Sequence, residues 1–421
     1  MKIWILQTGE PLHCDAGSPR PMRAMNLANA LIDAGHKVVI WSTSFYHQEK
    51  RHRVSGSQRV NVSESLEIRL LDSPGYQRNI GLGRLWDHAL LARNLVKQLK
   101  VEDSVPDVAF VGYPPIETAA VMTRWLASRK VPCMVDVKDQ WPVIFIDVLP
   151  AALKNFGRIA LSPYFYYGRR ALLNATGLTS MADGFLDWAA GFAGRALGDL
   201  DRLAPLTIPT GQITDAELQD AGSWWDQQGI HSDGTQRICF IGSHSNAFDM
   251  ELVIQTAKSM DAAGYPCQFV LCGQGENSMA WKEKAANLTN VYFPGWIDRA
   301  RFEALARRSC AALAPYHNSD DFVLSVPNKV IDYLSLGLPV LSPLRGEVSS
   351  LVANFDVGLS YGHADGKTLE SCIQDLAAMP ELRAKLSSNA LKLFHERFSF
   401  ETVYGGMVSH LEMLVRRHGE L

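Results

Sequence analysis

The sequence predicts an α/β protein in which two Rossmann-like domains face each other across a cleft. The chain has 421 residues, enough for two or three domains. Short apolar stretches alternate with stretches of helical period, as in parallel sheets covered by helices on both faces. This alternation occurs twice, with a linker containing Pro and Gly between the two sets. Two such units joined by a hinge would place an active site in the cleft, at the carboxyl ends of the strands.

The first set of elements opens the chain. Strands are expected at Lys2–Gln7, Lys37–Trp41, Val105–Gly112 and Pro132–Lys138, and helices from Pro21 to Gly35 and over Ile116–Ser128. Apolar residues from Ala24 to Leu31 recur on one face of the first helix. Gly35 is expected to end this helix, because glycine is common directly after a helix C-terminus. These patterns predict a parallel sheet in an N-terminal domain over residues 1–207.

The second set follows the linker Leu206–Ile213, which we interpret as the hinge. Strands are expected at Arg237–Ile241, Gln268–Cys272, Asn290–Phe293, Ala311–Ala314 and Pro339–Ser342, and helices at Phe248–Ala263, Ser278–Asn287, Arg299–Arg308 and Pro327–Leu336. They predict a second Rossmann-like domain over residues 208–397. A final helix is expected over Val403–Arg417, within residues 398–421.

The composition is that of an ordinary globular protein, with 47% hydrophobic and 20% charged residues. The net charge of −3 gives no attraction to nucleic acid. No apolar run approaches the roughly 18 residues of a membrane span, and the apolar N-terminal stretch is too short for a signal peptide. The seven cysteines include no C-x-x-C pair, which favours core thiols in a reducing cytoplasm. The twelve histidines show no metal-binding spacing, so no metal or cofactor is expected.

The most informative stretch runs from Ser325 to Pro343 and predicts a loop, a short helix and a buried strand. Pro327 suits the first helical turn, and Ser325 or Asn328 would cap the helix start. Lys329 and Asp332 lie three apart and share one helix face. The helix N-terminus and Lys329 would hold a phosphate, and Asp332 would accept hydrogen bonds from two ribose hydroxyls. The alternative is an exposed ion pair on an ordinary helix.

This stretch also resembles the donor-site block of retaining glycosyltransferases of family four, in the branch of bacterial capsule and O-antigen enzymes. The matching positions are Pro327-Asn328-Lys329, Asp332-Tyr333-Leu334, Gly337 and Pro339-Val340. The resemblance implies the GT-B fold, with an acceptor domain over residues 1–207 and a nucleotide-sugar donor domain over residues 208–397. In that fold the final helix, here within residues 398–421, crosses back to the N-terminal domain. The resemblance places the ribose-binding carboxylate of that family at Asp332. The other family carboxylate would fall on Leu324 and is absent, unless Asp320 or Asp321 takes its role.

Two further segments complete the expected donor site. Gly242 and Ser243 follow a predicted strand, where backbone and hydroxyl can approach a phosphate; a plain strand-to-helix turn is the alternative. The resemblance implies that the backbone at Trp296 and Ile297 recognises the nucleobase. A Trp packed at the domain edge explains Trp296 equally well. The G-x-G at Gly273 and Gly275 is explained by a tight turn without a ligand.

The expected acceptor residues lie in the first domain. The resemblance implies that Gly17 lets its loop approach the donor phosphate and the acceptor. Arg20 and Arg23 would meet an anionic acceptor such as a lipid diphosphate, although surface arginines are common. Asp139 lies just past a strand, in a run that resembles the Asp-Leu-Trp-Pro segment of the same enzymes. It is the candidate acid-base or acceptor-orienting carboxylate.

Residues 148–182 carry basic and aromatic side chains without any Asp or Glu. Such a segment suits an anionic membrane surface, and a hydrophobic helix pair inside the first domain is the competing interpretation.

The resemblance as a whole implies a glycosyltransferase that moves a sugar from a nucleotide-sugar, expected to be a UDP-sugar, to a glycan or polyprenyl-diphosphate-linked acceptor. Surface polysaccharide biosynthesis, retention at the anomeric carbon and the absence of a metal follow from the same resemblance. Lys329 would then be catalytic by stabilising the leaving diphosphate. The expected location is cytoplasmic, peripheral on the inner membrane. A sugar-nucleotide epimerase of the same fold and a non-catalytic nucleotide-sugar-binding subunit are the alternatives.

Overall fold

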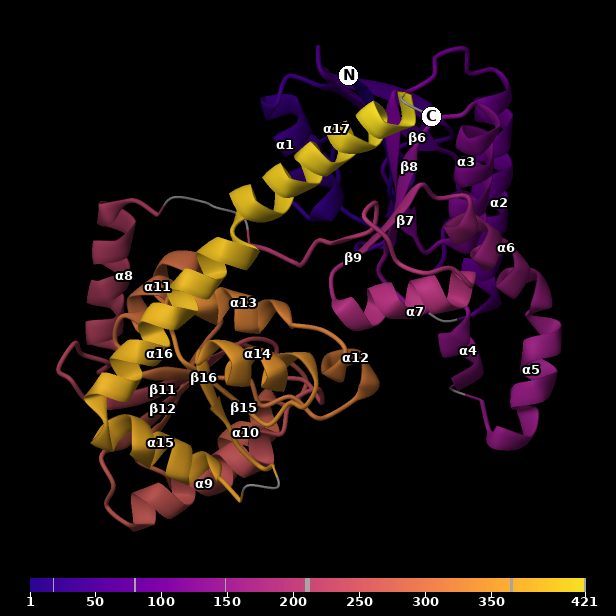
Figure 1. Cartoon of the computed structure of the whole chain (residues 1–421). Helices are drawn as coiled ribbons and strands as arrows, with labels where there is room; N and C mark the ends of the chain where they lie inside the picture. The colour runs from indigo at the N-terminus through magenta and orange to yellow at the C-terminus, as the bar shows by residue number, and fades with distance from the viewer. Residues whose placement is uncertain (18, 79–80, 148, 209–212, 364–365, 420–421) are drawn as a thin grey trace. The chain divides into compact units, whose positions relative to one another are not determined.

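A computed structural model describes the chain except residues 18, 79–80, 148, 209–212, 364–365 and 420–421. The chain divides into two compact units, shown in Figure 1. The first unit comprises Met1–Pro205 and Val403–Leu421, and the second comprises Leu206–Thr402. The sequence analysis placed the two boundaries after residues 207 and 397. The expected hinge, Leu206–Ile213, includes positions 209–212 and so lies partly outside the described residues.

The first unit is built on one sheet with the strand order β10-β9-β8-β7-β1-β2-β6-β5. The strands are β1 Lys2–Leu6, β2 Lys37–Thr43, β5 Gln58–Ser63, β6 Leu66–Leu71, β7 Val108–Tyr113, β8 Cys133–Val137, β9 Gly177–Ser180 and β10 Arg202–Leu203. Every pairing is parallel except the β5–β6 hairpin at one edge. The central strands are continuous apolar runs because helices cover both of their faces.

The helices of the first unit are α1 Arg23–Asp33, α2 Leu82–Lys100, α3 Ile116–Ser128, α4 Val143–Asp147, α5 Lys154–Ala160, α6 Ser162–Leu173, α7 Asp183–Ala193 and α17 Gly406–Gly419. The expected helix Ile116–Ser128 has the predicted bounds, because Ile116, Ala119, Met122 and Leu126 form a buried stripe at helical spacing. Two small strands, β3 Phe45–Tyr46 and β4 Arg51–His52, pair separately.

The second unit contains a six-stranded parallel sheet in the order β13-β12-β11-β14-β15-β16. The strands are β11 Gln236–Ile241, β12 Cys267–Cys272, β13 Val291–Gly295, β14 Ala311–Leu313, β15 Val340–Ser342 and β16 Gly358–Ser360. The helices are α8 Asp215–Gln227, α9 Met250–Ala262, α10 Ser278–Lys284, α11 Arg299–Ala306, α12 Asp320–Val323, α13 Asn328–Ser335, α14 Glu347–Phe355, α15 Leu369–Ala378 and α16 Pro380–Leu393.

In both sheets the first strand lies in the interior, and later strands are added on both of its sides. This is the doubly wound Rossmann order. The order reverses between β1 and β7 in the first unit and between β11 and β14 in the second. Ligands of such folds bind outside the carboxyl ends of the strands at this reversal. The predicted α/β class with two Rossmann-like domains is confirmed, whereas the cleft between them stays a prediction. No helix in the described ranges is long and apolar enough to cross a bilayer.

Candidate functional site

In the second unit, backbone hydrogen bonds join the loops at the carboxyl ends of β11, β12 and β13. The Gly242 amide donates to the carbonyl of Cys272 at 3.1 Å, and the Gly273 amide donates to that of Gly295 at 2.7 Å. A side chain at Gly273 would meet the carbonyl oxygen of Gly242, and one at Gly275 would meet the backbone of His244. The two glycines of the G-x-G therefore allow neighbouring loops to pack closely, which requires no ligand.

Lys329 reaches this point from α13, and its ammonium group lies at the carboxyl end of β11. Its Nζ donates a hydrogen bond to the carbonyl of Ile241 and lies 4.2 Å from the ring centre of Phe240. The side chain is buried, and a β-carbon on Gly242 would strike Nζ. Burial lowers the pKa of Lys329 to about 7, because the apolar surroundings disfavour the charged form. The alternative of an exposed ion pair on an ordinary helix is therefore wrong for Lys329, which is buried.

The start of α13 differs from the expectation. Pro327 occupies the N-cap position before the helix, with φ −62° and ψ 147°, and its own side chain makes no capping hydrogen bond. The proline ring restricts φ to a value that fits both the first helical turn and an extended N-cap residue. Pro327 takes the N-cap position, so the helix begins at Asn328, one residue later than expected. Asn328 is the first helical residue and is exposed, whereas Ser325 is half-buried. Leu324 is half-buried too.

Asp332 lies one helical turn beyond Lys329. Its carboxylate accepts a hydrogen bond from Arg299 at 3.4 Å, and its side chain retains 25% of its exposure. The negative charge of Asp332 raises the pKa of Lys329 against the larger effect of burial. The side chains of Asp320 and Asp321, named above as replacements for the absent carboxylate, lie outside the description. Asp332 is thus the carboxylate that the structure places beside the lysine.

The remaining predicted donor residues lie on loops at the same edge of the sheet. Ser243 is exposed after β11, and Trp296 is 67% exposed after β13. The alternative in which Trp296 packs at a domain edge is therefore wrong. Ile297 is buried in the core, so only its backbone is available to a ligand.

His244 follows Gly242 and Ser243 in the turn after β11 and was not among the predicted site residues. Its Nδ1 shares a 2.9 Å hydrogen bond with the Ser278 hydroxyl, and its ring packs 4.6 Å from that of Trp281. Its Nε2 is buried and has no hydrogen-bond partner in the described part of the chain. Burial lowers the pKa of His244 to about 4, so the ring is neutral at pH 7. A histidine two positions after the glycine that follows a predicted strand was the available signal in the sequence.

In the first unit, the predicted acceptor residues do not share one environment. Gly17 has φ +82° on the loop after β1, a conformation that favours glycine, and Arg20 is exposed. Arg23 was expected to face an acceptor, but its Nε and Nη2 bind the buried carboxylate of Asp136 at 2.8 and 2.7 Å. Both side chains are almost fully buried. Arg23 therefore anchors the start of α1, because a buried guanidinium requires a charged partner.

This ion pair extends into a buried network that the sequence did not reveal. Lys138 lies 3.8 Å from Asp136 and forms an ion pair with Glu10. Glu10 also accepts a hydrogen bond from the Ala24 amide at 2.9 Å. These groups come from the loop after β1, from α1 and from β8 with the residue that follows it. They fix the loops at the carboxyl ends of the central strands.

Asp139 follows β8 and is held by its own neighbours. One carboxylate oxygen accepts from the Gln140 amide at 2.8 Å, and the other accepts from the Trp141 indole at 3.0 Å. Each carboxylate oxygen has further lone pairs that can accept from a hydroxyl. The orientation of the Asp139 carboxylate is therefore fixed by its neighbours in the chain.

The two α-helices within the predicted basic and aromatic segment, α5 and α6, differ in burial. On α6, Gly168, Ala171 and Leu172 are buried, so that helix does pack inside the first unit. On α5, Phe156 and Ile159 are 70% and 73% exposed. The interpretation as a buried helix pair therefore holds for α6 and is wrong for α5.

A doubly wound Rossmann fold that occurs twice in one chain is the architecture of GT-B glycosyltransferase structures. Residues 235–378 match the family described as "Glycosyl transferases group 1". The chain thus carries a glycosyltransferase domain and is a glycosyltransferase. No protein with a curated description matches the chain by sequence.

Solved structures similar to nearly the whole chain include three proteins. Sucrose-phosphate synthase from Thermosynechococcus elongatus shares 15% identity at a TM-score of 0.65, with 99% of both chains covered. Anabaena Alr3699/HepE in complex with UDP shares 12% at 0.61, covering 98% of this chain and 99% of that one. WaaG, a glycosyltransferase involved in lipopolysaccharide biosynthesis, shares 13% at 0.60 with the same coverage. At these identities the likeness establishes the fold.

Proposed function

We propose that this glycosyltransferase moves a sugar from a UDP-sugar to a glycan or lipid-linked glycan acceptor in surface polysaccharide biosynthesis, with retention and without a metal. The observation that carries the proposal is the position of Lys329. Its ammonium lies in an apolar environment beside Gly242, at the carboxyl end of β11. A cation there can bind a diphosphate strongly, because little water screens it.

On the donor side, each predicted residue would bind a different part of the nucleotide. Lys329 and the N-terminus of α13 would stabilise the charge that develops on the leaving diphosphate. Asp332 would accept hydrogen bonds from the ribose hydroxyls. Trp296 is exposed at the end of β13 and would stack on the base. The structure of HepE with UDP-glucose supports a UDP-sugar as the donor to test first.

On the acceptor side, Asp139 would accept a hydrogen bond from the attacking hydroxyl and orient it. Its two local hydrogen bonds support this role, because they hold the carboxylate in one orientation. Arg20, exposed on the loop after β1, would attract an anionic acceptor. Arg23 is left out of this role because Asp136 occupies its guanidinium.

The exposed apolar residues of α5 support a peripheral location on the inner membrane. Phe156 and Ile159 lie three apart on one helix face, and the adjacent Arg158 is exposed and basic. Changing Arg169 and Arg170, both exposed on α6, to Glu should release the protein from anionic liposomes, because each basic residue near such a surface contributes about 1 kcal/mol. Equal binding of the variant to the liposomes would contradict this location.

The central experiment incubates the protein with a panel of nucleotide-sugars, with and without polyprenyl-diphosphate-linked glycans. Release of UDP is followed for the wild type, Lys329→Met and a matched control, Lys258→Met, whose lysine is exposed on α9. UDP release that depends on Lys329 supports the transferase, and the anomeric configuration of the product tests retention. An interconverted donor would indicate the epimerase. Tight binding without turnover would indicate the binding subunit.

A further inference from the structure

A large groove in the first unit lies outside both sets of predicted site residues. It has a volume of about 850 Å³ and lies between α2, α3 and α6. Alanines from two helices form much of its surface: Ala89 and Ala92 on α2, and Ala120 and Ala127 on α3. Their short side chains leave space between helices that would otherwise be filled. The groove is within the size range of sites for small organic ligands.

The groove also carries an unbalanced positive charge. Arg124 on α3 and Arg170 on α6 line it, and both are exposed. Within the described part of the chain, neither guanidinium has an ion pair or a side-chain hydrogen bond. The carboxylate that lines the groove, Glu117, accepts a hydrogen bond from the Tyr164 hydroxyl at 2.6 Å, and burial raises its pKa. The two arginines are therefore available to an anion.

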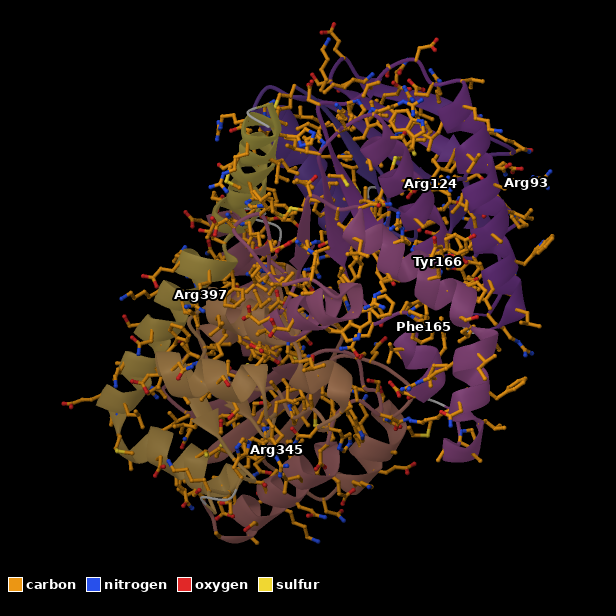
Figure 2. The ribbon with its side chains drawn as sticks, turned by 45° about the vertical axis from the view of Figure 1, so that its right-hand side comes forward. Arg93, Arg124, Phe165, Tyr166, Arg345 and Arg397 are labelled. Atoms are coloured by element: carbon orange, nitrogen blue, oxygen red, sulfur yellow. The ribbon has the colours of Figure 1, made fainter. Side chains whose placement is uncertain are left out.

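Tyr166 and Tyr167 lie on the α6 side of the groove and are 61% and 52% exposed. Figure 2 shows Tyr166 below Arg124, with Arg93 farther out on α2. Tyrosine has an apolar ring and a polar end, a combination that is enriched where proteins meet the membrane interface. The helix α6 begins two residues after α5 ends, so the groove is close in sequence to the exposed apolar face of α5.

From this combination we propose that the α2–α3–α6 groove binds a single anionic membrane lipid. The lipid phosphate lies between Arg124 and Arg170, and an acyl or isoprenyl chain lies along the alanine surface. Paired guanidinium groups suit phosphate oxygens, and the alanines remove apolar chain surface from water. The proposal deepens the membrane partner in the proposed function, because it gives one lipid molecule a defined site instead of a diffuse surface attraction.

The test is calorimetric titration of the full chain with monomeric dioctanoyl phosphatidylglycerol. The expected result is saturable binding with one lipid per chain. Arg124→Gln and Arg170→Gln should each weaken this binding about tenfold or more, since each removes a charged hydrogen bond. Ala120→Leu and Ala127→Leu should weaken it by filling the groove. Arg93→Gln is the matched control, because Arg93 is exposed on α2 but does not line the groove.

Several results would overturn the assignment. They are absence of lipid binding to the wild type, unchanged affinity in both alanine variants, or an equal loss in Arg93→Gln. Equal affinity for glycerol phosphate would show a phosphate site without a chain. A groove-dependent dimer would show that a second copy occupies it. UDP affinity should stay constant in every variant, because Lys329 and Asp332 lie in the other unit. If the protein binds the lipid but releases no UDP from nucleotide-sugars, the proposed transfer reaction is contradicted. The assignment of the groove as a lipid site then still stands.

Discussion

Replacing Lys329 should alter both the stability of the protein and the protons taken up when it binds UDP. Burial lowers the pKa of Lys329 from 10.5 to about 7. At ~1.36 kcal/mol per pKa unit, this difference corresponds to roughly 4–5 kcal/mol as an upper bound on the cost of burying the charge. Between pH 7 and pH 10.5, Lys329 is mostly protonated in the unfolded chain and mostly deprotonated in the folded chain. The free energy of unfolding should therefore rise with pH across that window.

Lys329→Met keeps an unbranched side chain of similar length and removes the titrating group. Its free energy of unfolding should exceed that of the wild type near pH 7 by a few kcal/mol, and the rise attributable to this group should disappear. Urea denaturation across the pH range measures both effects. Lys258→Met, on an exposed lysine, should leave the wild-type profile unchanged.

Diphosphate binding should restore the charge of Lys329, because a nearby anion raises the pKa of a lysine. Near pH 8 the free protein is mostly deprotonated at this position, so binding of UDP should take up close to one proton. Calorimetry of UDP binding in two buffers of different ionisation enthalpy measures this number directly. The uptake should vanish in Lys329→Met. Binding of UDP to the wild type without proton uptake would refute the assignment of Lys329 to the diphosphate.

Three other outcomes follow from the contacts described above. Arg23→Met should lower the free energy of unfolding by about 3–5 kcal/mol, because it leaves the Asp136 carboxylate buried and uncompensated, as urea denaturation would reveal. Asp139→Asn should reduce transfer at least tenfold while UDP affinity stays within a few-fold; a collapse of UDP affinity would contradict the acceptor role. Trp296→Ala should weaken the binding of uridine and of UDP equally, by about 1–3 kcal/mol, because stacking on the base is lost for both ligands. Calorimetric titration measures the two affinities, and no change in either would exclude stacking on the base.

The second unit was predicted most closely from the sequence. Its strands are short apolar runs bounded by Gly, Asn or Pro, and the predicted strand Arg237–Ile241 differs from β11 by one residue. The helix start at Pro327 was misplaced by one position, because proline fits both the N-cap and the first turn. Lys329 was identified from its spacing to Asp332, but its burial was not, since burial depends on Phe240 and Phe248 far away in the sequence.

In the first unit, the ion pair between Arg23 and Asp136 could not be predicted. The two residues are 113 positions apart, and neither local pattern distinguishes a buried arginine from an exposed one. The same limit applies to the groove between α2, α3 and α6. Its alanines fit ordinary helix propensity, and the space that they leave is visible only when three helices are packed together.

The position of helix α17 in the sequence affects when the first unit can complete its fold during translation. Its residues Met407, Leu411 and Leu414 are buried, and it packs against α1 and β7 although the whole second unit separates it from them in the sequence. The second unit is one continuous segment, Leu206–Thr402, between the two parts of the first unit. The surface of the first unit that α17 covers therefore stays uncovered until all of the second unit has been translated. We expect a fragment ending at Pro205 to expose this apolar strip and to aggregate.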